Sequence, residues 1–181
     1  MVPSGARDMA ARVILAYSGG LDTSVAIRWL IEKYDVEVIT LTVNLGGSKN
    51  IDGVKARALQ SGATKSFVID AREQFVDEFV WPALQVGAIY EGVYPLATAL
   101  ARPLIAQLQV EMARQENAFA VAHGCTGKGN DQVRFDVNTA ALGPDLKILA
   151  PAREWGMSRD QEIEYAHKHN IPLDLPKDNS Y

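Results

Sequence analysis

The feature that most constrains the fold of this chain is an alternation of short apolar runs with longer stretches of helical periodicity. Five runs have the length of a strand and are rich in β-branched residues or alanine: 13–17, 36–42, 65–69, 118–122 and 147–150. Continuous apolar runs of this kind are typical of strands that are buried on both faces of a parallel sheet. The sequence therefore predicts five buried strands.

Helical patterns occupy most of the segments between these runs, at 22–34, 52–61, 71–80, 97–115, 130–142 and 158–169. Strand and helix thus alternate, which favours right-handed crossovers and helices on both faces of the sheet. We expect a doubly wound α/β fold with strand order 3-2-1-4-5. The long span between strands three and four contains residues 90–113 and predicts a helical insertion beside the site.

Ligands of doubly wound sheets bind at the carboxyl ends of the strands, where the winding direction reverses. Two loops follow the strands that meet there: SGGLDTS, residues 18–24, and HGCTGKGNDQVR, residues 123–134. We expect both loops to face one crevice.

The glycine pair in the first of these loops suits a phosphate. Gly19 and Gly20 have no Cβ, and the helix that follows exposes the N–H groups of its first turn. Hydroxyl groups of Ser18, Thr23 and Ser24 would add donors. The structural alternative is a tight turn in which Asp22 caps the helix and the glycines only permit the bend.

Composition narrows the class of protein. A length of 181 residues with 48% hydrophobic content fits one globular domain, and a net charge of −4 argues against a broad surface for nucleic acid. The single cysteine, Cys125, cannot form an internal disulfide, and the chain shows neither a signal peptide nor a membrane span. We expect a cytoplasmic protein with a loose leader at 1–12 and one domain at 13–181.

The spacing of the glycines excludes two common nucleotide motifs, because neither G-x-x-x-x-G-K-[ST] nor G-x-G-x-x-G is present. The pattern S-G-G-x-D-x-S after the first strand instead resembles the PP-loop ATP pyrophosphatases. Further segments, YEGVYPLATALARPLIA, AHGCTGKGNDQVRF, LKILAPAREW and EYAHKHNIP, follow in order. Together they resemble the N-terminal, nucleotide-binding part of the argininosuccinate synthase family, from about residue 13 to 181.

This resemblance implies an ATP-dependent C–N ligase of arginine biosynthesis and the urea cycle. The ureido oxygen of citrulline is adenylated with release of pyrophosphate, and the amine of aspartate then displaces AMP to give argininosuccinate. A urea oxygen is a poor leaving group, so its conversion to a phosphate ester makes attack at carbon feasible. Mg²⁺ and oriented N–H donors offset the charge on pyrophosphate.

The resemblance also implies which residues bind ATP. Asp22 would act near the phosphates, with Mg²⁺ carried by ATP, and Val43 would lie against the adenosine. The nucleotide-binding positions are Ala16, Tyr17, Ser18, Gly19, Gly20, Leu21, Asp22, Thr23, Ser24, Val43, Ala122, His123, Gly124, Cys125, Thr126, Gly127, Lys128, Gly129 and Asn130.

The amino-acid substrates are assigned by the same resemblance. Citrulline would contact Tyr94, Arg134 and Asn130, and Arg102 is placed to meet a carboxylate. Aspartate would be held by Thr126, Asn130 and Asp131, and Asp131 would serve the aspartate amine in catalysis. A cap of the following helix is the alternative for Asn130 and Asp131.

Two of the nucleotide-binding positions have structural alternatives to a chemical role. His123 is more often a hydrogen-bonded structural group than a base, and Cys125 has no evident activating base and fits a lining role.

The chain departs from the family pattern at several positions. Ala99 and Ala97 stand where the family usually has serine and glycine, Pro95 adds rigidity, and NLGGSKN replaces the usual segment after strand two. Loss of the serine hydroxyl removes one hydrogen-bond donor to citrulline, worth about 0.5 to 1.5 kcal/mol.

The family continues into a second, synthetase domain and forms a homotetramer, so we expect the present chain to be the ATP-binding part. Two further hypotheses remain: a nucleotide sensor without catalysis, and a PP-loop enzyme that acts on another amide or urea.

Overall fold

The computed structural model describes residues 11–46 and 51–172. Five strands form one parallel sheet: β1 (Arg12–Ala16), β2 (Glu37–Asn44), β3 (Lys65–Asp70), β4 (Ala120–His123) and β5 (Lys147–Leu149). Their order is β3-β2-β1-β4-β5, with β1 parallel to both β2 and β4. This confirms the predicted fold class and strand order.

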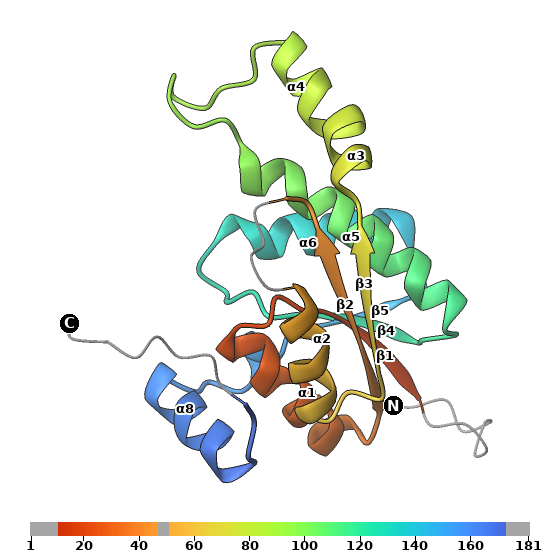
Figure 1. Cartoon of the computed structure of the whole chain (residues 1–181), viewed down its shortest axis with the longest axis vertical. Helices are drawn as coiled ribbons and strands as arrows, with labels where there is room; N and C mark the ends of the chain where they lie inside the picture. Colours follow the sequence, from red (N-terminus) through yellow and green to blue (C-terminus); the bar gives the residue numbers. More distant parts are fainter. Residues whose placement is uncertain (1–10, 47–50, 173–181) are drawn as a thin grey trace.

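Helices cover both faces of this sheet (Figure 1). On one face lie α1 (Leu21–Tyr34) and α2 (Ile51–Gln60), and on the other lie α5 (Ala97–Gln115) and α6 (Asn130–Leu142). The central strand β1 shows why both faces are needed. Its Val13 and Leu15 pack into the core on the α1 side, while Ile14 packs into the core on the α5 side, and all three are fully buried.

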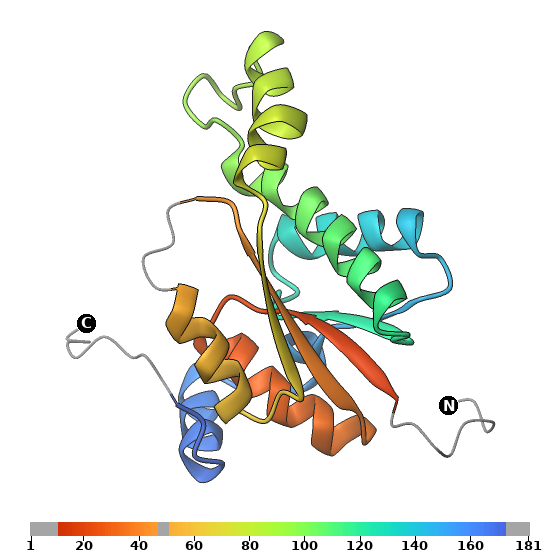
Figure 2. The ribbon, with the colours of Figure 1, turned by 45° about the vertical axis from the view of Figure 1, so that its right-hand side comes forward.

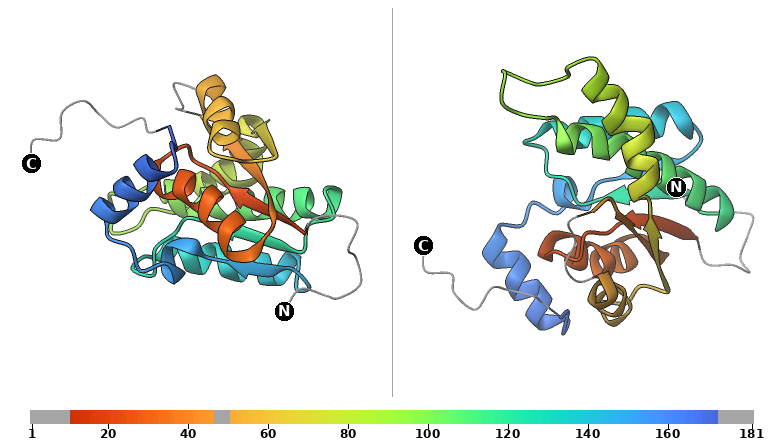
Figure 3. Two further views of the ribbon diagram at one scale, coloured as in Figure 1. Left: turned by 90° about the horizontal axis from the view of Figure 1, so that it is seen from below. Right: turned by 45° about the horizontal axis from the view of Figure 1, so that its top comes forward.

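The end of the described chain lies against α1 (Figure 3). A short helix, α7 (Pro151–Glu154), follows β5, and α8 (Arg159–Lys168) then packs on α1, where Ala166 and Ile171 join Leu21 and Val25 in a small apolar cluster. No pattern in the sequence predicted α7. Four residues are too few to show a helical period.

The helical insertion between β3 and β4 is confirmed. Its first part, α3 (Arg72–Phe75), a π-helical segment (Val76–Val80) and α4 (Trp81–Gln85), projects beyond the sheet (Figure 2). Its second part is α5, which returns along the sheet. Gln109 of α5, only 1% exposed, donates from Nε2 to the carbonyl groups of Ile14 and Ala122, at 2.7 Å each. These bonds join the insertion to β1 and β4.

Most predicted boundaries agree to within two residues, and those of α5 and α6 agree fully. The predicted helix at 71–80 extends to Gln85. Strand β1 begins at Arg12, because Arg12 pairs with Glu37 in the sheet and its Nε donates to that carboxylate at 3.0 Å. Residues 1–10 of the expected leader lie outside the described residues, as do 47–50 of NLGGSKN. None of the helices that the structure describes is long and apolar enough to cross a membrane.

Candidate functional site

A cleft of about 630 Å³ opens at the carboxyl ends of β1, β2 and β4. It is the crevice that the strand order predicts, and both loops reach it. Its lining includes twelve of the residues predicted for the site: Ala16, Tyr17, Ser18, Gly20, Leu21, Asp22, Thr23, Val43, Arg102, His123, Gly124 and Cys125.

The first loop has a backbone conformation that requires glycine. Gly19 has φ of +81°, and a Cβ there would lie 3.2 Å from Nη2 of Arg57 and from Cγ2 of Val54. Gly20 is extended and forms the N-cap of α1 without a side-chain bond to the first turn. The alternative in which Asp22 caps α1 is therefore wrong, since Asp22 is already the second residue of the helix.

Hydroxyl groups of the first loop bond to one another in this structure. Ser18 Oγ lies 3.2 Å from Thr23 Oγ1 and accepts the Gly20 N–H at 3.3 Å. Ser24 is 1% exposed, and its hydroxyl is hydrogen-bonded to that of Tyr17 at 2.9 Å. The structure thus places Ser18 and Thr23 at the cleft and Ser24 behind it, outside the lining.

The second loop approaches the first at Gly124. A Cβ at Gly124 would lie 2.8 Å from Cγ2 of Thr23, so glycine permits the two loops to touch. Gly124 and Cys125 line the cleft, whereas the following residues 126–130 are exposed and lie outside its lining. The family-derived ATP positions in this loop are therefore divided between the cleft and its rim.

Two helices begin at this site without a side-chain cap. Gly129 is the N-cap of α6, as Gly20 is of α1, and neither makes a side-chain capping bond. The capping alternative for Asn130 and Asp131 is therefore wrong, because both lie within the first turn. By contrast α8, whose N-cap is Ser158, carries a complete capping box with Gln161.

Three of the predicted substrate residues form one charged group at the edge of the cleft. Asp131 accepts from both predicted arginines: its Oδ2 lies 3.0 Å from Nη2 of Arg102, and its Oδ1 lies 2.7 Å from Nη1 of Arg134. Tyr94 lies on the insertion near the start of α5, where its hydroxyl accepts the Thr98 N–H at 3.1 Å. The bonds from Thr98 lower the pKa of Tyr94.

Asp22 of the first loop lines the cleft, and two residues of α8, Arg159 and Glu162, lie beside its carboxylate. Oδ1 of Asp22 lies 3.8 Å from Nη1 of Arg159, which also lines the cleft. Burial raises the pKa of Glu162 to about 7, and the neighbouring Asp22 carboxylate adds to this effect. No group of three or more His, Cys, Asp and Glu residues that could hold a metal occurs within 11–46 and 51–172.

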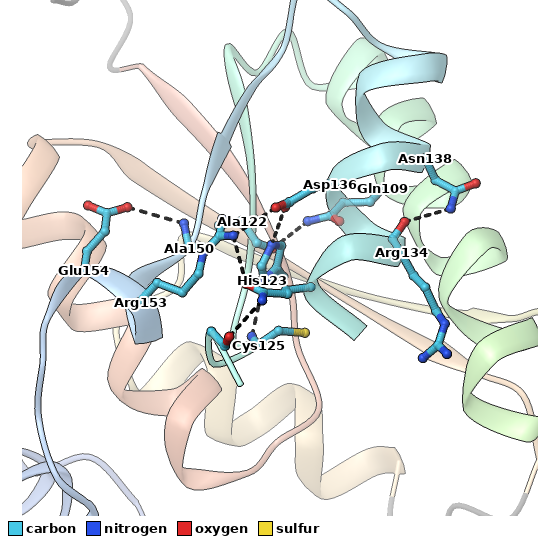
Figure 4. A network of polar contacts seen from close by, with 12 residues as sticks. Gln109, Ala122, His123, Cys125, Arg134, Asp136, Asn138, Ala150, Arg153 and Glu154 are labelled. Carbon is cyan, nitrogen blue, oxygen red and sulfur yellow. Dashed lines mark hydrogen bonds and ion pairs between the residues drawn. The ribbon is translucent and has the colours of Figure 1, made fainter. Parts of the chain in front are cut away.

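His123 and Cys125 have the structural environments of packing residues. His123 is 2% exposed, with Nε2 3.0 Å from Oδ1 of Asp136 and Nδ1 accepting the Cys125 N–H at 3.3 Å (Figure 4). Burial lowers the pKa of His123 and raises that of the Cys125 thiol. A neutral imidazole and a protonated thiol favour the structural alternative for both residues.

The lining of the cleft also contains residues that the sequence did not predict for the site: Leu41, Thr42, Leu45, Gly46, Ile105, Phe135 and Arg159. Four of them follow from the position of β2 beside β1, because the end of β2 and the residues after it reach the same edge. The others come from α5, α6 and α8, which contact the cleft only after the chain has folded. No local pattern in the sequence marks Arg159.

Comparison with known proteins decides the family. The family profile described as "Arginosuccinate synthase N-terminal HUP domain" matches residues 12–172. The chain belongs to the argininosuccinate synthase family. The matched region contains the whole cleft and both glycine loops.

Individual members of the family are similar over nearly the whole chain. The argininosuccinate synthase of Brevibacillus brevis is 59% identical over 94% of this chain and 41% of its own length. That of Oceanobacillus iheyensis is 58% identical over 94% and 41%, and that of Dehalococcoides mccartyi is 54% identical over 96% and 43%. The chain thus spans about two fifths of the length of these curated relatives.

Proposed function

We propose that the cleft binds ATP with Mg²⁺ and that this chain is the nucleotide-binding part of an argininosuccinate synthase. The observation that carries the proposal is the first loop: a left-handed Gly19 followed by a helix that begins without a side-chain cap, at the edge of a cleft of about 630 Å³. Backbone N–H groups in this arrangement are a binding site for phosphate.

The contrast among helix N-termini supports this reading. Where α8 begins, Ser158 Oγ accepts the N–H of Gln161 in the first turn, and Gln161 Oε1 accepts the N–H of Ser158 itself. Where α1 begins at the cleft and α6 begins at its rim, glycine occupies the N-cap position and offers no such group. The N–H donors at the cleft are thus available to a ligand, and two such helix ends favour an anionic one.

Apolar side chains form part of the lining of the cleft. Val43, Leu41 and Leu45 come from the end of β2, and Ile105 and Phe135 come from α5 and α6. These side chains provide the apolar surface that a purine requires, in agreement with the expected position of Val43 against the adenosine.

The residues present fit a magnesium ion that arrives with ATP. Asp22 would repel a phosphate group beside it unless a cation lay between them. Mg²⁺ in nucleotide sites is held by one or two carboxylates together with phosphate oxygens and water, so Asp22 alone suffices. Bound there, Mg²⁺ would neutralise charge on the departing pyrophosphate.

The ligation that the relatives' name describes requires the cleft and its rim together. In the proposed reaction the ureido oxygen of citrulline attacks the α-phosphorus of ATP, the bond to pyrophosphate breaks, and the aspartate amine then attacks carbon and releases AMP. Tyr94, Asn130 and Arg134 would hold citrulline, and Thr126 and Asp131 would hold aspartate. The pair of arginines on Asp131 keeps this carboxylate oriented at the rim.

We expect residues 13–181 to form a single PP-loop domain. The complete ligation is expected of a cytoplasmic homotetramer whose subunits have the length of the relatives. Neither nucleic acid nor a membrane is expected as a partner. The present chain alone is expected to bind ATP without efficient synthesis. A sensor that binds ATP without turnover remains the second candidate, favoured by Ala99, which lacks the hydroxyl group of the usual serine.

Isothermal titration of the chain with ATP, with and without Mg²⁺, tests the first part. Asp22→Ala is expected to abolish the dependence on Mg²⁺, whereas Asp145→Ala, which removes an exposed carboxylate paired with Arg114, leaves it unchanged. AMP release that requires both citrulline and aspartate, measured in a protein of the relatives' length, tests the second part. Binding without AMP there would instead support the sensor, and absence of binding would contradict both.

A further inference from the structure

A ring of polar contacts holds the second loop from behind, and it includes charged residues that do not line the cleft. Four side chains form it. Figure 4 shows three of them, His123 at the end of β4, Asp136 on α6 and Arg153 on α7, and the fourth is Gln132 on α6. Neither Asp136 nor Arg153 belongs to the lining of the cleft or to the residues expected to bind ATP or the amino acids.

The contacts on one side of this ring fix the start of the loop. The backbone N–H of Cys125 donates to Nδ1 of His123, so Nδ1 is an acceptor and the ring proton resides on Nε2. Nε2 then donates to Oδ1 of Asp136 at 3.0 Å, and Oδ2 of the same carboxylate accepts from Nη1 of Arg153 at 2.9 Å. A charged pair thereby selects the tautomer that holds the Cys125 amide.

The contacts on the other side fix the middle of the loop. The same Nη1 of Arg153 donates to Oε1 of Gln132 at 3.0 Å, and Nε2 of Gln132 donates to the carbonyl oxygen of Gly127 at 3.0 Å. The loop is thus held at the amide of Cys125 and at the carbonyl group of Gly127. Both connections end at one guanidinium group.

Arg153 is itself held in place through α7. Glu154, the next residue, accepts a hydrogen bond from the hydroxyl group of Tyr34 on α1 at 2.5 Å and another from the N–H of Ala150 at 3.4 Å. Helix α1 therefore contributes to the position of both loops. It begins at the first loop, and through Tyr34 it holds α7, which carries Arg153.

We propose that Arg153 and Asp136 are positioning residues that, through His123 and Gln132, hold residues 124–129 in the conformation that closes the cleft against Thr23. This inference rests on the proposed function, because it assumes that the cleft binds a nucleotide. Arg153 and Asp136 would affect that nucleotide indirectly, through the second loop. Gly124 leaves no space between the loops, since a Cβ there would lie 2.8 Å from Thr23 Cγ2. Small displacements of the second loop therefore change the shape of the cleft.

Two measurements on this chain test the proposal. The first is hydrogen exchange of the Cys125 amide without nucleotide, which is expected to become about tenfold faster in Arg153→Ala and in Asp136→Ala. The second is the dissociation constant of MgATP, expected to rise roughly tenfold in each variant. Arg153→Lys, which keeps the charge, is expected to recover part of both effects.

Matched variants separate this role from general stability. Arg114→Ala removes an exposed arginine that pairs with Asp145, and it is expected to leave both measurements within twofold of wild type. Because both connections end at Arg153 and Asp136 lies on one of them, the double variant is expected to bind MgATP about as weakly as Arg153→Ala alone. Independent effects, near a hundredfold in the double variant, would overturn the proposal. If a variant fails to fold, Asp136→Asn and Gln132→Ala test the two sides of the ring separately.

The outcomes also distinguish this inference from the proposed function. If the wild-type chain does not bind MgATP, the proposed function fails, while hydrogen exchange at Cys125 still tests the ring. If the wild-type chain binds MgATP and the exchange rate of the Cys125 amide is the same in Arg153→Ala, the positioning role is wrong.

Discussion

The two glycine loops at the cleft are held by different kinds of interaction. In the first, hydrogen bonds join residues close in the sequence, from Ser18 to Thr23 and from the Gly20 N–H to Ser18, around a left-handed Gly19 at the start of α1. The second is held by residues distant in the sequence, because His123 and Gln132 connect it to Arg153, which comes from beyond β5. The first conformation is local and the second depends on the complete fold.

This difference predicts how each loop responds to substitution. A change within the first loop acts through backbone strain and should appear directly in the free energy of unfolding. A change around the second loop should alter ligand binding and local hydrogen exchange more than global stability, because its contacts lie at the periphery of the core.

The largest effect is expected from Gly19→Ala. A non-glycine residue in the left-handed region costs about 1 to 2 kcal/mol, and the new Cβ would lie 3.2 Å from the side chains of Val54 and Arg57. We expect the free energy of unfolding, measured by urea denaturation, to fall by about 2 kcal/mol.

Gly20→Ala is the matched control for this change. Gly20 has φ of −79° and ψ of 174°, which alanine adopts readily, and the nearest atom to a new Cβ is Ser18 Oγ at 3.4 Å. We expect a change within about 0.5 kcal/mol. Equal losses in the two variants would contradict the assignment of the strain to Gly19.

Gly124→Ala tests the contact between the loops. The added methyl group would meet Thr23 Cγ2 at 2.8 Å, so the loops must separate; because they can do so at the edge of the cleft, we expect a cost of about 1 kcal/mol, the low end of the range for overpacking. Thr23→Ser removes that Cγ2 and keeps the hydroxyl group. We therefore expect Gly124→Ala to weaken MgATP binding and to lower Tm, and the double variant with Thr23→Ser to recover most of both.

Failure of Thr23→Ser to rescue would show that Gly124 has another role, such as direct approach of its backbone to the nucleotide. The remaining atoms near a Cβ at Gly124, the Thr23 backbone nitrogen and the Asp22 Cβ, lie at ordinary contact distances of 3.7 and 3.9 Å. They leave no second steric explanation in the first loop.

The same contrast explains what the sequence could predict. The first loop, the strand order and the helices 97–115 and 130–142 follow from local patterns: apolar periodicity, glycine spacing and the reversal of the winding direction. The ring around the second loop does not, because Asp136 and Arg153 are ordinary charged residues in the sequence, and only the pairing of β4 with β5 brings them together.

The capping alternatives for three site residues are wrong for a related reason. Asp22, Asn130 and Asp131 are good capping residues, so local preference offered the cap as the alternative to a binding role. Glycine takes that position at both helices, and each helix begins just before its acidic residue. A binding site that needs open N–H groups works against the local preference, and this is where a sequence rule is expected to fail.

At the second loop, the titration of His123 is expected to change the free energy of unfolding with pH, by less than Gly19→Ala changes it. Burial lowers the pKa of His123 below its usual value near 6.5, while Asp136 favours and Arg153 opposes its protonation. Below pH 6.5 the unfolded chain binds a proton that the folded chain does not, so stability falls with decreasing pH, by up to roughly 1.4 kcal/mol per unit between the two pKa values.

We expect His123→Asn, which cannot titrate but keeps an acceptor for the Cys125 N–H, to remove this part of the pH dependence. Urea denaturation between pH 5 and pH 8 measures it, with His167→Asn, an exposed histidine on α8, as control. A slope that is the same in wild type and His123→Asn would show that His123 titrates alike in the folded and unfolded chains.

The smallest effect is expected from Gly129→Ser, and its sign makes it informative. Gly129 is the N-cap of α6 in an extended conformation, and nothing lies within 4 Å of a Cβ placed there. A serine hydroxyl can accept an N–H of the first turn, so we expect the free energy of unfolding to rise by a few tenths of a kcal/mol. Thermal unfolding of the ligand-free chain measures this gain.

If the first turn of α6 donates to a bound amino acid, the same serine competes with that ligand. In a protein of the relatives' length we then expect a higher KM for aspartate together with the higher Tm. A gain in stability without a change in KM would indicate that the open N-terminus of α6 does not serve the substrate. Of the two helices that begin at a glycine N-cap, α1 alone would then act as a ligand site. The two loops would then differ both in the interactions that hold them and in the ligands that they bind.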